Sequence, residues 1–375
     1  MKFRNLSVAY IGSLHALLAL TLIKSDFVDR VENRVARTTW ISGSESVAEI
    51  KPAYKYVSRT KDAAVIWQND LRVVLAKLLG ISEQLSARTS SVSGFDVLTL
   101  KSEERRGAGT KGSGIDRSFS YRIDELRLLK VGFNPVDVIL TVPTNINRPM
   151  PAIVLIAGHG STMHTPFESA NGYYRIGREL AESGYITIST SVADHNQPPL
   201  PRTLIGDRLL QLLTCVDYLM SLDVVDKDRV GCAGKSLGGE MAMWLGAFDQ
   251  RIKATVSSGF LTQIPQLLAY DHCPCWNFPG LTNAVEFSDV YSLIAPRPLQ
   301  CQNGLQEDPS GFPVSIASIA FREIELIYKD FGAIGCVEFV PFEGGHELDT
   351  RSLISFFERY LRDELTNTSN ASSGR

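Results

Sequence analysis

The segment Gly234-Lys235-Ser236-Leu237-Gly238 constrains this 375-residue chain more than any other feature, because of what flanks it. Residues 229–233 form a short apolar run typical of a buried strand, and residues 239–245 carry apolar side chains at helical spacing. A serine between a strand and a helix lies on a sharp, strained turn that pushes its hydroxyl away from the backbone. Side chains in place of the two glycines would collide there. The pattern therefore predicts that Ser236 is a nucleophile.

A serine nucleophile needs a base, and His346 is the candidate. Of the six histidines, it alone follows a Gly-Gly pair after a predicted strand, residues 335–340, in the last part of the chain. We expect its imidazole to take the proton of the Ser236 hydroxyl.

The base in turn needs a carboxylate to orient it, and Asp308 is the expected acid. It follows the predicted strand 298–303, and Pro309 begins a tight turn that could aim the carboxylate inward. Glu307, its neighbour, is the one serious rival.

The negative charge that develops during acyl transfer requires backbone N–H donors. We expect one from Leu237, which follows the serine, and another from the loop after the very apolar strand at residues 151–157. Ser161 is the predicted second donor, with Gly160 next. His159 is expected to shape this turn through a hydrogen bond to the backbone rather than to transfer protons, and both His159 and Gly160 are expected to lie against the substrate.

Strands and helices alternate through most of the chain, which predicts an α/β fold with a mostly parallel central sheet and helices on both faces. Ligands bind such a sheet at the carboxyl ends of its strands. Ser161, Ser236, Asp308 and His346 all follow predicted strands, so they are expected to gather at that edge. A β-hairpin at residues 118–131 and 136–142 is expected to precede it. The predicted strands are 152–157, 185–190, 229–233, 253–258, 298–303 and 335–340, and the predicted helices are 171–183, 203–222, 238–247, 314–331 and 350–363.

Outside the alternating region we expect an N-terminal helical extension. Residues 63–80 carry apolar side chains at helical intervals and end at Gly80, whereas residues 101–118 are rich in charge, glycine and serine and suggest a loop. The expected organisation is a leader or N-terminal helix at 1–25, an extension and loop at 26–120, a catalytic domain at 121–364 and a disordered tail at 365–375.

An aromatic-rich excursion at residues 259–296 interrupts the alternation. We expect it to form a lid over the site, with Trp276 in the substrate wall, and the alternative is a small core beneath a long loop. Lys235, before the serine, is expected either to extend to solvent, which we favour, or to contact an acidic group of the substrate.

The six cysteines do not form the pattern of a disulfide framework. Cys232, Cys301 and Cys336 fall in predicted buried strands and Cys215 in a helix, where a thiol behaves as a small apolar group. The pair Cys273-Pro274-Cys275 lies beside His272, but no second pair at zinc spacing follows, so a structural loop near the active site is the favoured interpretation.

The charge balance argues against nucleic acid as a partner, because 38 basic and 41 acidic residues give a net charge of −3 without a basic stripe. The apolar run from Val8 to Ile23 has the shape of a secretory leader but is short for a stable membrane span. A cytoplasmic location is slightly favoured, secretion is the alternative if residues 1–25 are a leader, and the oligomeric state stays open.

Several motifs together resemble the α/β-hydrolase superfamily of serine esterases, in particular its branch related to dienelactone hydrolases and acetyl xylan esterases. The resemblance covers residues 121 to about 363 and rests on residues 229–239, Ala295-Pro296-Arg297-Pro298-Leu299, Asp308-Pro309 with Phe312-Pro313, Gly344-Gly345-His346, and the 271–275 and 279–281 segments. It implies a Ser236–His346–Asp308 triad with N–H donors at Leu237 and near Ser161. Ser310-Gly311 lengthens the spacer after Asp308-Pro309 relative to that family.

These observations predict a serine hydrolase of carboxylic esters, acetyl esters included, that acts on a small-molecule or sugar ester through an acyl-enzyme. No metal or organic cofactor is expected. The alternatives are a peptidase or a dienelactone or carbon–carbon bond hydrolase with the same triad. A catalytically silent ligand-binding protein of this fold is the alternative of a different class.

Overall fold

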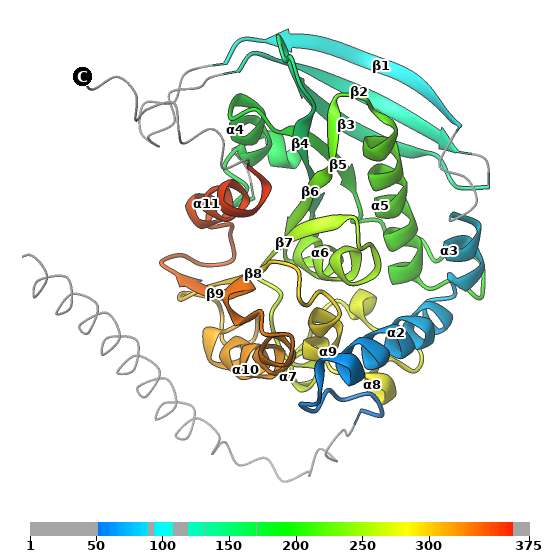
Figure 1. Ribbon diagram of the computed structural model, residues 1–375, viewed down its shortest axis with the longest axis vertical. Coiled ribbons are helices and arrows are strands. Elements are labelled where there is room, and N and C mark those ends of the chain that lie inside the picture. Colours follow the sequence, from blue (N-terminus) through cyan, green and yellow to red (C-terminus); the bar gives the residue numbers. More distant parts are fainter. Residues whose placement is uncertain (1–51, 89–93, 108–118, 131, 170, 363–375) are drawn as a thin grey trace, which may run out of the picture. The chain divides into compact units, whose positions relative to one another are not determined.

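A computed structural model describes residues 52–88, 94–107, 119–130, 132–169 and 171–362 (Figure 1). The expected leader at 1–25 and the expected tail at 365–375 lie outside these residues. Within the described residues, no helix is both long and apolar enough to cross a bilayer.

Nine strands of the described residues form one sheet in the order β1-β2-β3-β5-β4-β6-β7-β8-β9. The strands β4 to β9 are parallel to one another, whereas β1, β2 and β3 are antiparallel to their neighbours. The mostly parallel sheet and the β2–β3 hairpin are therefore confirmed. The strands are β1 (Phe95–Arg105), β2 (Tyr121–Lys130), β3 (Val136–Pro143), β4 (Met150–Ala157), β5 (Ile186–Ser191), β6 (Val225–Lys235), β7 (Ile252–Ser258), β8 (Leu299–Gly304) and β9 (Val337–Phe342).

Helices cover both faces of the sheet, as predicted (Figure 1). Alternate residues of β4 show the two faces: Ala152, Val154 and Ile156 belong to one buried cluster, and Ile153 and Leu155 to the other. The first cluster includes side chains of α5, α6 and α10, and the second includes those of α4 and α11. The helices are α4 (Ile176–Glu182), α5 (Leu204–Ser221), α6 (Leu237–Phe248), α10 (Val314–Asp330) and α11 (Thr350–Leu361).

The strand β1 corrects one expectation, because residues 101–105 continue a strand rather than a loop. Nearly every side chain of β1 is exposed or half-buried, so the alternation of buried and exposed positions that marks a strand is missing. Antiparallel pairing with β2 supplies the order that the local pattern does not show.

The predicted N-terminal helix is confirmed as α2 (Lys61–Leu78). It ends as expected at Gly80, whose φ of +71° closes a C-terminal cap with a hydrogen bond from Ile81 N to Ala76 O. Gln68 and Arg72 attach α2 to the body by donating to backbone carbonyls that include those of Ser292 and Ala247. A short helix, α3 (Ser82–Arg88), follows.

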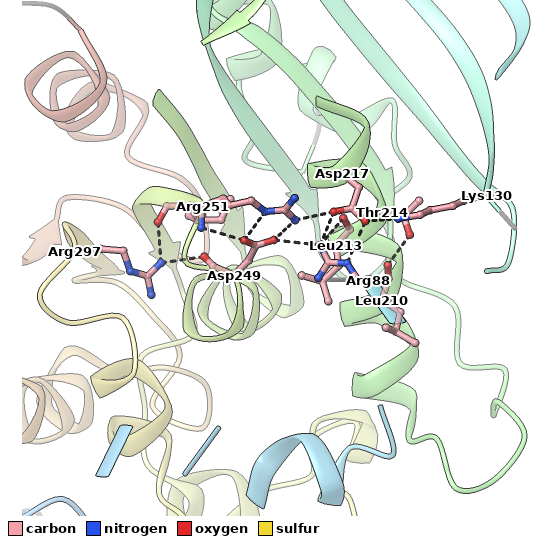
Figure 2. Close-up of polar contacts among 10 residues, drawn as sticks. Arg88, Lys130, Leu210, Leu213, Thr214, Asp217, Asp249, Arg251 and Arg297 are labelled. Carbon is pink, nitrogen blue, oxygen red and sulfur yellow. Dashed lines mark hydrogen bonds and ion pairs between the residues drawn. The ribbon is translucent and has the colours of Figure 1, made fainter. Parts of the chain in front are cut away.

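A network of charged side chains connects α3, α5 and the start of β7 (Figure 2). The Asp217 carboxylate forms ion pairs with Arg88, Lys130 and Arg251 at distances of 2.6 to 2.7 Å. Asp249 binds Arg251 at 2.6 Å and Arg88 at 3.4 Å. Both carboxylates are almost completely buried. Because Asp249 and Arg251 lie just before β7, this charge network stands at the amino end of the parallel strands.

Candidate active site

Ser236 lies on a turn between β6 and α6 with φ of +59° and ψ of −126°. Positive φ is uncommon for a residue with a side chain and stores strain that the surroundings must hold. Here the Ser236 N–H donates to Ser258 O at 2.9 Å, and Ser236 O accepts from Glu240 N at 2.9 Å. The turn thus presents the serine side chain at the carboxyl end of the sheet, as the sequence predicted.

The two glycines around the serine are required by close backbone contacts. A Cβ atom on Gly234 would lie 2.1 Å from Gly238 O, and one on Gly238 would lie 2.1 Å from Ile156 O. Such distances are far inside van der Waals contact. The steric reason inferred for the Gly-x-Ser-x-Gly spacing therefore holds in the structure.

His346 meets a carboxylate, but the carboxylate is that of Glu307. His346 Nδ1 lies 2.8 Å from Glu307 Oε1, and the glutamate side chain is only 4% exposed while the imidazole is 37% exposed. A bond at Nδ1 leaves Nε2 as the nitrogen available for proton transfer. This geometry brings the predicted base together with the rival acid of the sequence analysis.

The expectation for Asp308 is corrected, because its carboxylate turns away from His346. Asp308 Oδ1 accepts from Ser310 N at 2.8 Å and from Ser310 Oγ at 2.5 Å in an exposed turn. These hydrogen bonds hold the pKa of Asp308 below its usual value. Pro309 does begin a turn, as supposed, but the turn directs the aspartate to its own backbone.

The loops that carry the acid and the base are joined by backbone hydrogen bonds. Leu305 N donates to Phe342 O at 2.9 Å, and Gln306 N donates to Gly344 O at 2.8 Å. These bonds continue the β8–β9 pairing, which ends at Gly304 and Phe342. The sheet itself therefore brings Glu307 next to His346.

Lys235 also departs from expectation, since its side chain is buried rather than extended to solvent. It is 9% exposed, and its Nζ donates to His346 O at 3.1 Å and lies 5.4 Å from the centre of the Tyr173 ring. Burial lowers the pKa of Lys235, and the charge of Glu307 acts in the opposite direction. Lys235 thus holds the backbone of the loop that carries His346.

Ser161 does not offer a free N–H group as predicted, because its N–H donates to Gly158 O at 3.2 Å. Within the described residues, the backbone N–H groups of His159 and Gly160 have no such partner. The loop stands against the nucleophile, since a Cβ on Gly158 would lie 3.3 Å from Ser236 Cβ. Tyr173, which the sequence analysis missed, supports it by accepting from Gly158 N at 2.8 Å.

The excursion at residues 259–296 contains α7 (Ile264–Ala269), α8 (Leu281–Ala284) and α9 (Phe287–Ser292), with a 3-10 turn at Pro274–Trp276. Trp276 is only 5% exposed and packs edge-on against Phe287, with ring centres 5.9 Å apart. It belongs to the main hydrophobic core of the described residues rather than to a small separate core, and its burial does not support its expected place in the substrate wall.

Two further residues shape the surroundings of His346. Phe312 stacks on the imidazole with ring centres 5.5 Å apart and an angle of 18°. Gly259, at φ of +61°, approaches so closely that a Cβ there would lie 3.1 Å from His346 Cε1 and 3.5 Å from Glu307 Oε1. Sequence reasoning did not single out Gly259 as a site residue, although its position directly after the predicted strand 253–258 could have indicated it.

The side chain of His159 faces cysteine rather than backbone, which corrects the expected turn-shaping bond. His159 Nε2 lies 3.1 Å from Cys275 Sγ, and His195 Nε2 lies 3.2 Å from Cys273 Sγ. His272, the histidine considered with this cysteine pair, instead contacts Ser310 O at 2.7 Å. Cys336, expected in a buried strand, likewise lies in a 3-10 turn just before β9 and is half-buried.

Comparisons with known proteins agree with this architecture. A crystal structure of a "putative acetyl xylan esterase" from Bacteroides fragilis NCTC 9343 is similar with a TM-score of 0.60 and 17% identity, over 84% of this chain and 88% of that one. A glucuronoyl esterase from Solibacter usitatus is similar with a TM-score of 0.60 and 14% identity, over 86% and 98% of the two chains. The fold is that of the α/β-hydrolases.

Sequence comparison points the same way over part of the chain. Residues 204–272 match the family model of acetyl xylan esterases (AXE1). A protein of Bacillus subtilis (strain 168) named "Putative hydrolase YtaP" is 30% identical over 145 residues, which are 38% of this chain and 48% of that protein. The match thus spans about half the length of this curated relative.

Proposed function

We propose that this protein is a serine hydrolase of carboxylic esters, with Ser236 as nucleophile, His346 as base and Glu307 as acid. The observation that carries the proposal is the 2.8 Å contact of His346 Nδ1 with the buried Glu307 carboxylate, at the same edge of the sheet as the strained Ser236 turn. A hydroxyl, an imidazole and a carboxylate in this fold support acyl transfer.

In the proposed mechanism, Ser236 Oγ attacks the ester carbonyl while His346 Nε2 takes the hydroxyl proton. Glu307 keeps the Nδ1 proton in place and stabilises the imidazolium that forms. His346 then protonates the leaving alcohol, and a water activated by the same nitrogen releases the acid and frees the serine. In each half-reaction, His346 gives up the proton that it has taken: to the leaving alcohol in acylation, and to Ser236 Oγ in deacylation.

The oxyanion of each tetrahedral intermediate needs N–H donors at the serine turn. Leu237 is the first residue of α6, and N–H groups in the first turn of a helix have no acceptor within the helix. The N–H groups of His159 and Gly160, across from Ser236, are the second source. Gly160 adopts φ of +64°, and a Cβ on it would meet no atom within 4 Å, so this loop is open on that side.

Acetyl esters of sugars are the proposed substrate class. The match of residues 204–272 to the acetyl xylan esterase model and the likeness to solved esterases support this choice. A peptidase, a dienelactone or carbon–carbon bond hydrolase, and a silent ligand-binding protein remain the alternatives. In the test below, preferred turnover of the peptide favours the peptidase, preferred turnover of the lactone favours the dienelactone hydrolase, and neither turnover nor labelling favours the silent protein.

The test compares the wild-type protein with Ser236→Ala on p-nitrophenyl acetate, acetylated xylo-oligosaccharides, a peptide and a lactone. We expect acetate release by the wild type and a loss on the order of 10⁴-fold or more in the variant, with an unchanged thermal unfolding midpoint. A fluorophosphonate probe should label the wild type and not Ser236→Ala. Activity that survives the substitution, or no labelling and no turnover of any ester, would overturn the proposal.

A further inference from the structure

Four potential metal ligands converge beside the serine turn from three separate segments. They are His159 in the loop after β4, His195 in the loop after β5, and Cys273 and Cys275 in the excursion. One ring nitrogen of each histidine and the two Sγ atoms all lie within 4.8 Å of one another. The three segments are far apart in the sequence, so it is the fold that brings the four residues together.

The arrangement has the geometry of a four-coordinate site. Each histidine Nε2 lies close to a different sulfur: the distance is 3.1 Å for His159–Cys275 and 3.2 Å for His195–Cys273, near the ligand-to-ligand distance of a tetrahedral site. A tetrahedron with the usual Zn–N and Zn–S bond lengths has edges of about 3.4 to 3.8 Å, so a pair of ligand atoms at the 4.8 Å limit has to close by about 1 to 1.4 Å. The two imidazoles are stacked, with centres 5.4 Å apart, and present their Nε2 atoms to the same sulfur pair.

The donor set selects the type of ion. Two thiolates and two neutral imidazoles favour a borderline-soft cation without a preference for octahedral oxygen ligands, which excludes Mg²⁺ and Ca²⁺ as occupants. Two thiolates also neutralise the two positive charges of Zn²⁺. With all four positions filled by protein, such a site is closed and structural rather than catalytic.

A buried cation lies behind the cysteine pair. Arg208 is 2% exposed, and its guanidinium lies close enough to Cys275 to act on the thiol as a charge. Its Nε and Nη1 atoms have no hydrogen-bond partner among the described residues, while Nη2 donates to Asp194 O at 2.9 Å. A metal-bound thiolate at Cys275 is an acceptor that would satisfy one of these groups, in the way that outer hydrogen bonds support metal ligands.

We propose that His159, His195, Cys273 and Cys275 bind one Zn²⁺ ion. Binding releases the thiol protons of the two cysteines, while Nε2 of each histidine donates its lone pair and Nδ1 keeps the ring proton. The ion ties the loop after β4, which carries the N–H groups of His159 and Gly160, to the excursion and to the loop after β5. It therefore fixes the wall of the site opposite Ser236, whether or not the protein is an esterase.

The chain offers matched controls for this proposal. His272→Gln changes a histidine directly next to the cysteine pair whose ring contacts Ser310 O instead of the cluster. Cys336→Ser changes a half-buried thiol elsewhere. His195→Gln and Cys273→Ser change exposed ligands, so these two variants are expected to fold.

The experiment uses the full chain without a polyhistidine tag, reduced and freed of metal with a chelator. Adding Zn²⁺ should give about one tightly bound ion per chain by elemental analysis, and Co²⁺ should give thiolate charge-transfer and tetrahedral d–d bands. His195→Gln, Cys273→Ser and Cys275→Ser should weaken Zn²⁺ binding by at least about 100-fold, more than the loss of an outer-shell partner. His272→Gln, Cys336→Ser and Ser236→Ala should bind as the wild type does.

Zinc should also raise the thermal unfolding midpoint of the wild type and not that of Cys273→Ser, because a ligand that binds only the folded state stabilises it. Absence of stoichiometric zinc in the reduced wild type would overturn the proposal. So would cobalt spectra that Cys273→Ser leaves unchanged, or a Cys273–Cys275 disulfide that persists under the reducing conditions of the titration. Because Ser236→Ala must still bind zinc, failure here and failure of the proposed esterase are distinguishable.

Discussion

The amino and carboxyl ends of the parallel strands carry opposite arrangements of polar side chains. At the amino end, the charge network gives Asp217 three cationic partners and Asp249 two, all of them close and largely buried (Figure 2). At the carboxyl end, Glu307 is buried against a single imidazole that stays 37% exposed, next to a serine in a strained conformation.

The difference separates stability from reactivity between the two ends of the parallel strands. A buried carboxylate with several cations contributes to the free energy of folding because removing it leaves charges without partners. A strained serine and a half-exposed imidazole contribute little to folding but are accessible to a substrate. Substitutions at the two ends should therefore have different consequences, and variants can test this.

The largest expected effect is at the catalytic end. Glu307→Gln removes the negative charge that holds the imidazole and stabilises its protonated form, so we expect kcat/KM for p-nitrophenyl acetate to fall about 10³- to 10⁴-fold. Asp308→Asn is the matched control next to it, and a change below about twofold is expected because the Asp308 carboxylate hydrogen-bonds to Ser310 rather than to His346. If instead Asp308→Asn abolishes turnover and Glu307→Gln does not, the acid has been wrongly assigned.

A second prediction concerns the charge network. Asp217→Asn removes the negative charge that pairs with Arg88, Lys130 and Arg251. The free energy of unfolding should therefore fall by about 3–5 kcal/mol. Turnover per folded molecule should stay within about twofold. Asp137→Asn is the control, since its ion pair with Arg127 is exposed and should contribute under about 1 kcal/mol. Equal losses in the two variants, measured by urea denaturation, would contradict the assigned role.

The effect of Asp217 should depend on pH with a definite sign. Burial acts to raise the pKa of Asp217, but the contacts of Arg88, Lys130 and Arg251 outweigh it and lower the pKa to about 2. The stability that the carboxylate contributes is therefore complete above its unfolded pKa of about 4 and is lost as the pH falls toward 2. The difference in unfolding free energy between wild type and Asp217→Asn should shrink over that interval; a difference that grew would refute the depressed pKa.

The smallest expected effect is at Tyr173, where a substitution should lower both stability and turnover. Tyr173→Phe removes the hydroxyl that accepts from Gly158 N and leaves a buried N–H without a partner. We expect a loss of about 1–3 kcal/mol in unfolding free energy and up to about a tenfold fall in kcat/KM, because the loop opposite Ser236 is displaced. Tyr270→Phe, at an exposed position, serves as control and should change neither quantity.

The sequence predicted the features that depend on local pattern. Apolar runs and helical spacing located the parallel strands and their helices, and the glycines around Ser236 identified the strained turn. Glu307 and Asp308 are adjacent and chemically alike, and only the turn to Ser310 decides which carboxylate reaches His346, so local pattern did not separate them.

Other errors share a tertiary cause. The burial of Lys235 depends on a carbonyl more than a hundred residues away, and that of Trp276 on packing against Phe287. The histidine–cysteine cluster is drawn from three loops, so the spacing rules that reveal zinc sites in short segments do not apply to it. The edge strand β1 was missed because its exposed side chains show no alternation.

The hydrogen bonds that extend the β8–β9 pairing into residues 305–306 and 342–344 have a consequence for how chain length can vary here. Any residue added before Glu307 would shift the carboxylate out of step with His346. Residues added after Glu307 lie beyond the last of these hydrogen bonds. Ser310-Gly311 can therefore lengthen the spacer without disturbing the contact between Glu307 and His346. Insertions and deletions among relatives of this protein should therefore begin only beyond position 307.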